Sequence, residues 1–219
     1  RKYAPNLVLC VSLSGRTFSK FEERSDVLDL EGVLKPDMGS LTLSSLNFNQ
    51  IASVNSPEMI QKLAIKMKEK GIVPELEAFD AGMINYAKYL KKKELIYPPF
   101  YFNILLGNIA CAQADILYAG LMIRDLPENS FWSLAGIGDN QLKINSVAIA
   151  IGGGVRVGLE DNIWYDASRT ALARNIDLIK RIHVLAEANG RKVMTSEKFR
   201  KLMQLQPGNG LYGRTPVTI

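Results

Sequence analysis

Metal-binding side chains are scarce in this sequence of 219 residues, which contains one histidine and two cysteines. Cys10 and Cys111 are far apart in the sequence and do not form the closely spaced pairs typical of structural zinc sites. Cys10 lies in an apolar strand pattern, which predicts a buried free thiol in a reducing cytoplasm. His183 lies in a predicted helix on a partly exposed face, so it is not expected to bind a ligand.

Long apolar runs and concentrated charge are also absent. No apolar stretch approaches the roughly 20 residues that span a bilayer, and the apolar run at 7–11 is only as long as a strand, so no signal peptide is predicted. The formal net charge is +5, and the single tight basic run, at 91–93, is expected at the solvated end of a helix. No basic stripe interleaved with aromatic residues indicates nucleic-acid binding. We therefore expect a cytoplasmic protein that binds neither membranes nor nucleic acids.

Short apolar runs alternate with helical patterns along the chain. The apolar runs predict strands at 7–13, 38–43, 74–79, 101–106, 131–135 and 155–160. The helical patterns lie at 56–71, 81–95, 112–123, 140–151, 168–189 and 195–205. The first of these helices has clear end signals, with Ser56-Pro57 before it and Gly71 after it. Six consecutive strand–helix units predict a parallel sheet covered by helices.

Two architectures can hold such units, an open doubly wound sheet and a (β/α)8 barrel. No glycine-rich phosphate-binding fingerprint follows the first strand, which disfavours the dinucleotide-binding form of the open sheet. Six units are two short of a closed barrel, and the chain begins at Arg1 rather than at a methionine. We therefore expect a (β/α)8 TIM barrel of which residues 1–205 supply strands 3 to 8, followed by a Pro/Gly-rich extended tail at 206–219.

The segment 155–162 carries the strongest indication of a functional site. Side chains alternate along a strand, so the apolar residues at 155, 157 and 159 share one face and Arg156 and Glu160 lie on the other. Unpaired charges are costly to bury, so this face requires a partner, a ligand or a metal. A structural Arg–Glu pair and a functional site both satisfy that requirement.

Other predicted strands also place polar residues on a single face. These residues are Cys10, Ser12, Ser14, Ser40, Thr42, Glu75, Glu77 and Ser133. Most lie toward the C-terminal ends of the strands, where barrel active sites are found. Glu75 and Glu77 require positive charge, and Arg156 is the only evident inward cation, so a divalent cation or a cationic substrate would balance them. The glycines at 152–154 could form an anion-binding nest or a helix C-cap and turn.

Four blocks of this sequence resemble the β-keto acid cleavage enzymes, typified by the 3-keto-5-aminohexanoate cleavage enzyme of lysine fermentation. The blocks are KPDMGSLTLSSLNF (35–48), PELEAFDAGM (74–83), WSLAGIGDNQL (132–142) and GGGVRVGLEDN (152–162). The resemblance implies a zinc-bearing (β/α)8 barrel that forms a homo-oligomer, which we expect to be a tetramer. It also implies an acyl-transferring enzyme that condenses a β-keto acid with acetyl-CoA, giving acetoacetate and a new acyl-CoA.

The resemblance implies a role for individual residues. Glu160 takes the position of a zinc ligand, and the other two ligands are a His-x-His pair that is expected outside this chain segment. Arg156 and Asp161 take the positions of a catalytic ion pair, with Asp161 as the base. Substrate-contacting positions match Ser12, Thr42 and Glu75, although Glu77 is an alternative to Glu75.

Two other functions remain open at this stage. A truncated barrel could be a non-catalytic binding or assembly module, in which case no turnover is expected. A phosphate-binding TIM-barrel enzyme could use the glycines at 152–154, and it would bind phosphate rather than a metal. In the enzyme reading, the 219-residue chain alone is expected to be inactive, because it supplies one zinc ligand where a protein site requires at least three. The two acids at 75 and 77 favour an amino-bearing substrate such as 3-keto-5-aminohexanoate.

Overall fold

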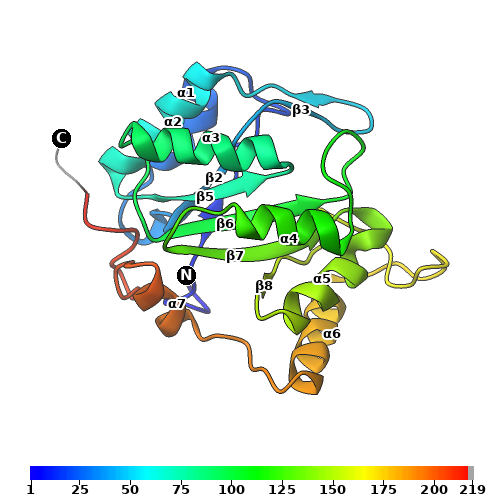
Figure 1. Cartoon of the computed structure of the whole chain (residues 1–219). Helices are drawn as coiled ribbons and strands as arrows, with labels where there is room; N and C mark the ends of the chain where they lie inside the picture. Colours follow the sequence, from blue (N-terminus) through cyan, green and yellow to red (C-terminus); the bar gives the residue numbers. More distant parts are fainter. Residues whose placement is uncertain (217–219) are drawn as a thin grey trace.

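The computed structural model describes residues 1–216 and contains a curled sheet of six parallel strands (Figure 1). The strands are β1 (Cys10–Val11), β2 (Met38–Thr42), β5 (Val73–Ala78), β6 (Phe100–Leu106), β7 (Ser130–Gly136) and β8 (Gly154–Val155). They lie in the order β1-β2-β5-β6-β7-β8, and every neighbouring pair is parallel. Because the order never reverses, the sheet is a half-barrel rather than a doubly wound sheet.

The helices follow the strands in alternation. They are α1 (Phe21–Ser25), α2 (Pro57–Lys70), α3 (Ala81–Lys92), α4 (Ile116–Arg124), α5 (Gln141–Ala150), α6 (Asn175–Ala188) and α7 (Ser196–Leu202). Three short 3-10 helices, η1 (Asp26–Asp29), η2 (Gly32–Leu34) and η3 (Gly138–Asn140), and a hairpin of β3 (Leu46–Asn47) and β4 (Ala52–Ser53) complete the structure. Figure 1 shows α2, α3 and α4 side by side over one face of the sheet. No helix of the described residues is long and apolar enough to cross a membrane.

The predicted end signals of α2 are confirmed. The Ser56 hydroxyl accepts a hydrogen bond from the Met59 N–H at 3.1 Å, which satisfies one of the free donors at the start of the helix. Pro57 occupies the first turn, where its missing N–H has no cost. Gly71 ends the helix with φ +65, a left-handed conformation that other residues adopt with strain.

Strand alternation divides the sheet into an apolar outer face and a polar inner face. Leu76, Phe102 and Leu134 are buried in the main core between the sheet and its helices. Their strand neighbours Glu75 and Ser133 point to the other side, where the half-barrel encloses a cavity. The predicted polar interior of these strands is therefore confirmed.

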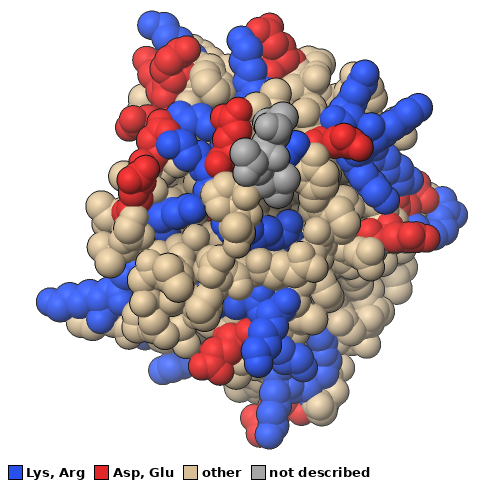
Figure 2. Space-filling view, turned by 90° about the vertical axis from the view of Figure 1, so that its left-hand side faces the viewer, with Lys and Arg blue, Asp and Glu red and all other residues tan. Residues whose placement is uncertain are grey.

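The helix α7 and the following chain cover the N-terminal end of the strands. A small core cluster forms there from Met38, Val73, Met203 and Leu205. Residues 206–216 of the predicted extended tail turn at the bridge between Gly208 and Leu211 and return to the body of the molecule. Figure 2 shows this end of the molecule, where uncharged residues cover most of the centre and Lys, Arg, Asp and Glu side chains lie mainly around the edge.

A buried ion pair fixes that covering in place. Asp37 is fully buried and accepts hydrogen bonds from both terminal nitrogens of Arg200, at 2.7 and 2.9 Å. Its carboxylate also accepts from the backbone N–H groups of Leu9 and Gly213, each at 3.0 Å, and from Arg1 at 2.9 Å. One carboxylate thus joins the segment before β1, the helix α7 and the tail at the N-terminal end of the strands.

The last strand–helix unit differs most from the sequence-based prediction. The strand predicted at 155–160 ends at Val155, because Asn145 bonds to the Arg156 carbonyl at 3.0 Å and the chain then turns at 158–161. The helix predicted to begin at 168 begins at Asn175 instead. In the loop before this helix, the Asp166 carboxylate accepts hydrogen bonds from the backbone N–H groups of Thr170 and Ala171, at 3.1 and 2.7 Å. These bonds close the loop.

The other differences concern segment ends and short elements. The first strand is two residues long rather than seven, and α4 begins at Ile116, after a loop in which Asp115 caps the helix. The helix α1 and the β3–β4 hairpin were not predicted, because neither is long enough to show a periodic apolar pattern.

Candidate active site

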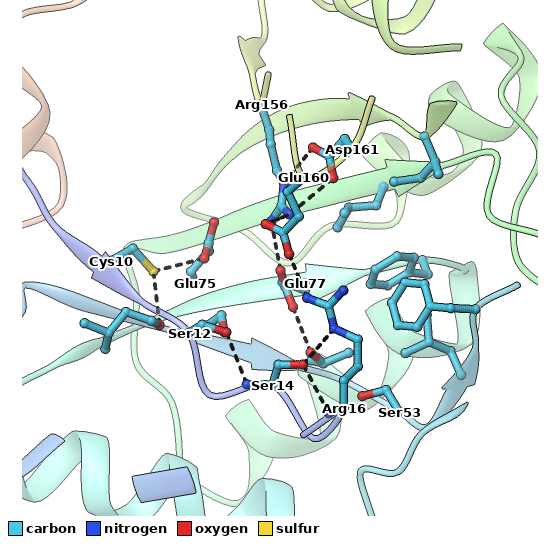
Figure 3. A pocket seen from close by; sticks show the side chains of 18 residues that line it. Cys10, Ser12, Ser14, Arg16, Ser53, Glu75, Glu77, Arg156, Glu160 and Asp161 are labelled. Carbon is cyan, nitrogen blue, oxygen red and sulfur yellow. Dashed lines mark hydrogen bonds and ion pairs between the residues drawn. The ribbon is translucent and has the colours of Figure 1, made fainter. Parts of the chain in front are cut away.

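The C-terminal ends of the strands enclose a cavity of about 230 Å³ (Figure 3). The lining residues come from β1 and its following loop, β2, β5 and the turn after β8, with further side chains from the β3–β4 hairpin, the end of β6 and the residue after β7. Its polar lining consists of Cys10, Ser12, Ser14, Arg16, Ser40, Thr42, Ser53, Glu75, Glu77, Arg156, Glu160 and Asp161. All six site residues that the sequence predicted, Ser12, Thr42, Glu75, Arg156, Glu160 and Asp161, are brought together there.

Arg156 is the centre of the charged cluster. Its Nη1 donates to Glu77 at 2.9 Å, its Nη2 to Glu160 at 3.1 Å, and its Nε to Asp161 at 3.1 Å. Burial acts to lower the pKa of the guanidinium, but the negative charges of Asp161 and Glu77 outweigh it and raise that pKa above its ordinary value. Arg156 is therefore fully ionised and orients three carboxylates at once.

Asp161 is the most buried of those three carboxylates, with 8% of the residue exposed. Burial raises the pKa of its side chain above the usual value, although the charge and hydrogen bond of Arg156 act in the opposite direction. The Asp161 backbone carbonyl also accepts a 2.7 Å hydrogen bond from the Gly138 N–H, which fixes the turn that carries the side chain. Asp161 is thus a carboxylate held in one orientation, with a pKa raised by its burial.

Glu75 and Glu77 lie two residues apart on β5 but have different partners. Glu77 is paired with Arg156 and accepts a 2.7 Å hydrogen bond from the Thr42 hydroxyl. Glu75 is bonded only to neutral donors, the Cys10 thiol at 3.0 Å and the Asn103 amide. Burial, and then the nearby charge of Glu77, raises the pKa of Glu75. Of the two acids, Glu75 is the one without a cation in contact.

Asn103 belongs to a buried hydrogen-bonded row that crosses three strands. The Ser133 hydroxyl on β7 donates to the Asn103 amide oxygen on β6, and the Asn103 amide nitrogen donates to Glu75 on β5. Asn103 is 3% exposed and Ser133 is fully buried. The row fixes which way the Asn103 amide faces and therefore presents an N–H donor to Glu75.

Two expectations about the cavity are wrong. Cys10 is a free but exposed thiol rather than a buried one, because it faces the interior of the half-barrel and not the apolar core. Arg156 is not the only inward cation, because Arg16 enters the cavity from the loop after β1 and contacts Glu160 at 2.8 Å. A loop residue carries no periodicity, so only the excess of acids in the cavity could have indicated a second cation.

The triple glycine lies elsewhere. Gly152, Gly153 and Gly154 border a separate groove at the other end of β8. Gly152 follows α5 with φ +90, and a Cβ on Gly153 would lie 1.9 Å from the ring of Trp132. A helix-ending turn and close ring packing account for the glycines, which supports the C-cap interpretation. His183 is exposed on α6 and lines neither of these two sites.

The described residues do not by themselves form a metal site. Among residues 1–216 there is no group of three or more His, Cys, Asp or Glu side chains arranged to hold a metal ion. Glu160, the predicted zinc ligand, instead contacts the guanidinium groups of Arg16 and Arg156. Its carboxylate would need further ligands from outside these residues to hold a divalent ion.

A parallel half-barrel with an arginine–carboxylate cluster at the C-terminal ends of its strands has the architecture of a TIM-barrel enzyme. Residues 1–205 match the family described as beta-keto acid cleavage enzyme. The chain belongs to this family.

Relatives with described functions support the assignment. The chain is 32% identical over 208 residues to the 3-keto-5-aminohexanoate cleavage enzyme of Fusobacterium nucleatum, covering 94% of this chain and 74% of that protein. It is 34% identical over 219 residues to the 3-oxoadipate:acetyl-CoA acetyltransferase of Cupriavidus necator, covering 99% of this chain and 75% of that protein. The chain therefore spans about three quarters of these relatives.

Solved structures support the fold. The chain superimposes on ObcA, determined in a ternary complex with a C4-CoA adduct and oxalate, with a TM-score of 0.73 and 20% sequence identity. The match covers 93% of this chain and 54% of ObcA. The chain thus corresponds to about half of that protein, and at this identity the similarity concerns the fold alone.

Proposed function

We propose that this chain carries the acid–base part of the active site of an enzyme that transfers acyl groups between a β-keto acid and acetyl-CoA. The products are acetoacetate and the CoA thioester of the remaining acyl group. The contact of Arg156 with Asp161, inside a cavity at the C-terminal ends of the strands, is the observation on which the proposal rests. Family membership and the names of the relatives support the same reaction class.

Asp161 is proposed to remove a proton from the carbon between the carboxylate and the keto group of the substrate. The resulting carbanion attacks the thioester carbonyl of acetyl-CoA, and the CoA thiolate leaves. That thiolate then adds to the original keto carbon, and the carbon–carbon bond to the former α-carbon breaks. The electrons of that bond form the enolate of acetoacetate, which recovers the proton from Asp161, so atoms and charge balance.

Arg156 is proposed to keep Asp161 in place throughout this sequence. Its Nε and Nη2 both face Asp161, at 3.1 and 3.4 Å, so the carboxylate cannot rotate freely. Its other contacts, with Glu77 and Glu160, tie that orientation to β5 and to the turn after β8. A base held in one orientation reacts with the proton of a bound substrate without first paying an ordering cost.

Ser12, Thr42 and Glu75 are proposed to contact the substrate. Thr42 already donates to Glu77, whose carboxylate is paired with Arg156, so Glu75 is the acid that is better placed to receive an ammonium group. This supports an amino-bearing substrate such as 3-keto-5-aminohexanoate, and with it a role in lysine fermentation. A cationic group near Glu75 would also offset the cavity's excess of carboxylates over guanidiniums.

Zinc dependence is a separate proposal, with Glu160 as one ligand and the other ligands outside residues 1–219. A bound divalent ion would supply Lewis-acid polarisation of the keto oxygen. Because the described residues do not form such a site on their own, no step above depends on the ion. The cytoplasmic location and the homotetramer remain predictions as well.

The reaction is tested by measuring acetoacetate formed from acetyl-CoA and a panel of β-keto acids, amino-bearing acids first, with the intact natural protein. Arg156→Ala and Asp161→Asn should each lower kcat by about 10²- to 10⁴-fold, the usual loss on removing a general base. Asp161→Asn is the cleaner test, because Arg156 keeps Glu77 and Glu160 as partners in that variant, whereas Arg156→Ala leaves the buried Asp161 carboxylate unpaired. Circular dichroism and thermal melting of both variants should show a folded protein, with the lower melting temperature in Arg156→Ala. Normal turnover by either variant would remove that residue from the mechanism, and no turnover by the unaltered protein would favour a non-catalytic module.

A further inference from the structure

The two guanidinium groups in the cavity differ in how many of their donors are used. All three nitrogens of Arg156 donate to carboxylates. Arg16 donates through Nε to the Ser14 hydroxyl at 3.1 Å and through Nη2 to Glu160 at 2.8 Å. Its Nη1 has no hydrogen-bond partner among residues 1–216, so Arg16 is the cation in the cavity with donors available to a ligand.

The loop that carries Arg16 is firmly held. Arg24 is buried and donates to the Leu13 carbonyl through two nitrogens, at 2.9 and 2.7 Å, and to the Asn55 side chain at 2.7 Å. These bonds join the loop after β1 to the segment that follows the β3–β4 hairpin. From the same hairpin loop, the ring of Phe48 lies 5.2 Å from the Arg16 guanidinium carbon. The guanidinium is therefore positioned over the cavity rather than free in solvent, and Figure 3 shows its end directed at Glu160.

The ion pair between Arg16 and Glu160 can be replaced by a pair between Arg16 and another anion with little loss of free energy. The two side chains are 39% and 60% exposed, and ion pairs in such surroundings contribute only about 0–1 kcal/mol. Glu160 also keeps its 3.1 Å contact with Arg156, so it remains paired when Arg16 moves to another anion. An incoming carboxylate can thus take the place of Glu160 on Arg16 without leaving a buried charge unpaired.

We propose that Arg16 is the residue that binds the carboxylate of the β-keto acid, which replaces Glu160 as the partner of its guanidinium. The inference rests on the proposed function, because every β-keto acid has this carboxylate and it passes unchanged into acetoacetate. A planar guanidinium offers two parallel N–H donors that match the two oxygens of a carboxylate. Holding that group fixes the neighbouring α-carbon, from which the proton is removed, relative to Asp161.

The experiment compares Arg16→Gln, Arg16→Lys and the unaltered intact natural protein. Loss of a charged hydrogen bond should raise the KM for the β-keto acid by about 10- to 100-fold in Arg16→Gln, with a smaller rise in Arg16→Lys. The KM for acetyl-CoA should stay within about twofold. Arg169→Gln is the matched control, because it breaks an exposed ion pair of the same 2.8 Å length, with Asp139, outside the cavity. It should leave both KM values unchanged.

A second measurement separates this proposal from the proposed function. Calorimetric titration with acetoacetate, without acetyl-CoA, should give a Kd about 10- to 100-fold weaker for Arg16→Gln than for the unaltered protein. Equal Kd values, or a KM for acetyl-CoA that rises as much as the KM for the keto acid, would overturn the role of Arg16. If the Kd for acetoacetate is weaker in Arg16→Gln as predicted but the unaltered protein shows no turnover, Arg16 is retained as a carboxylate-binding residue and the proposed reaction is refuted instead.

Discussion

Replacing Asp37 by Asn should be among the most destabilising single changes in this protein. The substitution keeps the shape of the side chain but removes the charge opposite Arg200, whose side chain is 2% exposed. Breaking one partner of a buried ion pair leaves an uncompensated charge and costs about 3–5 kcal/mol. The hydrogen bonds that Asp37 accepts from Leu9 and Gly213 would also weaken, because an amide oxygen carries less charge than a carboxylate.

The assay is urea unfolding of the intact natural protein, with Asp29→Asn as the control. Asp29 contacts Lys66 and Lys70, at 2.5 and 2.9 Å, but is 47% exposed, so its loss should cost about 0–1 kcal/mol. Burial alone would raise the pKa of Asp37, but Arg200 and the backbone N–H donors hold that pKa below its usual value. Its contribution is therefore complete above the ordinary aspartate pKa and is lost as the pH falls through the lower folded-state pKa. Equal destabilisation by the two variants would refute the assignment of Asp37 as a buried anchor.

Two further predictions concern the cavity. The Asn103 amide donates a hydrogen bond that lowers the pKa of Glu75, and Asn103→Leu removes it. The pKa of Glu75 should therefore rise further in this variant, and the acidic limb of the profile of kcat/KM against pH should move to higher pH. Ser133→Ala removes only the hydrogen bond that orients the Asn103 amide, so it should produce a smaller shift in the same direction. An unchanged profile in Asn103→Leu would show that Glu75 does not titrate in catalysis. The zinc content of the intact natural protein and of its Glu160→Ala variant can be compared by elemental analysis. The variant should lose most of the bound zinc. Equal stoichiometric zinc in both proteins would refute Glu160 as a ligand.

Much of the site could be predicted from the sequence because strand periodicity decides which side chains share a face. Alternation on β5 placed Glu75 and Glu77 opposite Leu76, and the structure confirms that arrangement. The position of Arg156 directly after β8 brought it into the same cavity even though the predicted strand was too long. Period-two reasoning therefore succeeded on β5, where ladders of hydrogen bonds to β2 and β6 fix the backbone.

Loops and tertiary contacts set the limits of that reasoning. Arg16 lies in a loop, and its distance to Glu160, 144 residues away in sequence, depends on how the whole sheet curls. The early end of β8 depends on the Asn145 side chain, which bonds to the carbonyls of Leu134 and Arg156. No local pattern at 155–160 reports that competition. Cys10 has the neighbours of a core residue in sequence, and only the open interior of the half-barrel explains its exposure.

The central claim is that the acetyl group of acetyl-CoA becomes part of acetoacetate, while the remaining acyl group of the keto acid leaves on CoA. Acetyl-CoA labelled with ¹³C at the carbonyl, incubated with the intact natural protein and an amino-bearing β-keto acid, tests this directly by carbon NMR. The label should appear at the keto carbon of acetoacetate, and the new acyl-CoA should carry none. Label that remains in acetyl-CoA or appears only in free acetate, while the keto acid is consumed, would contradict the account.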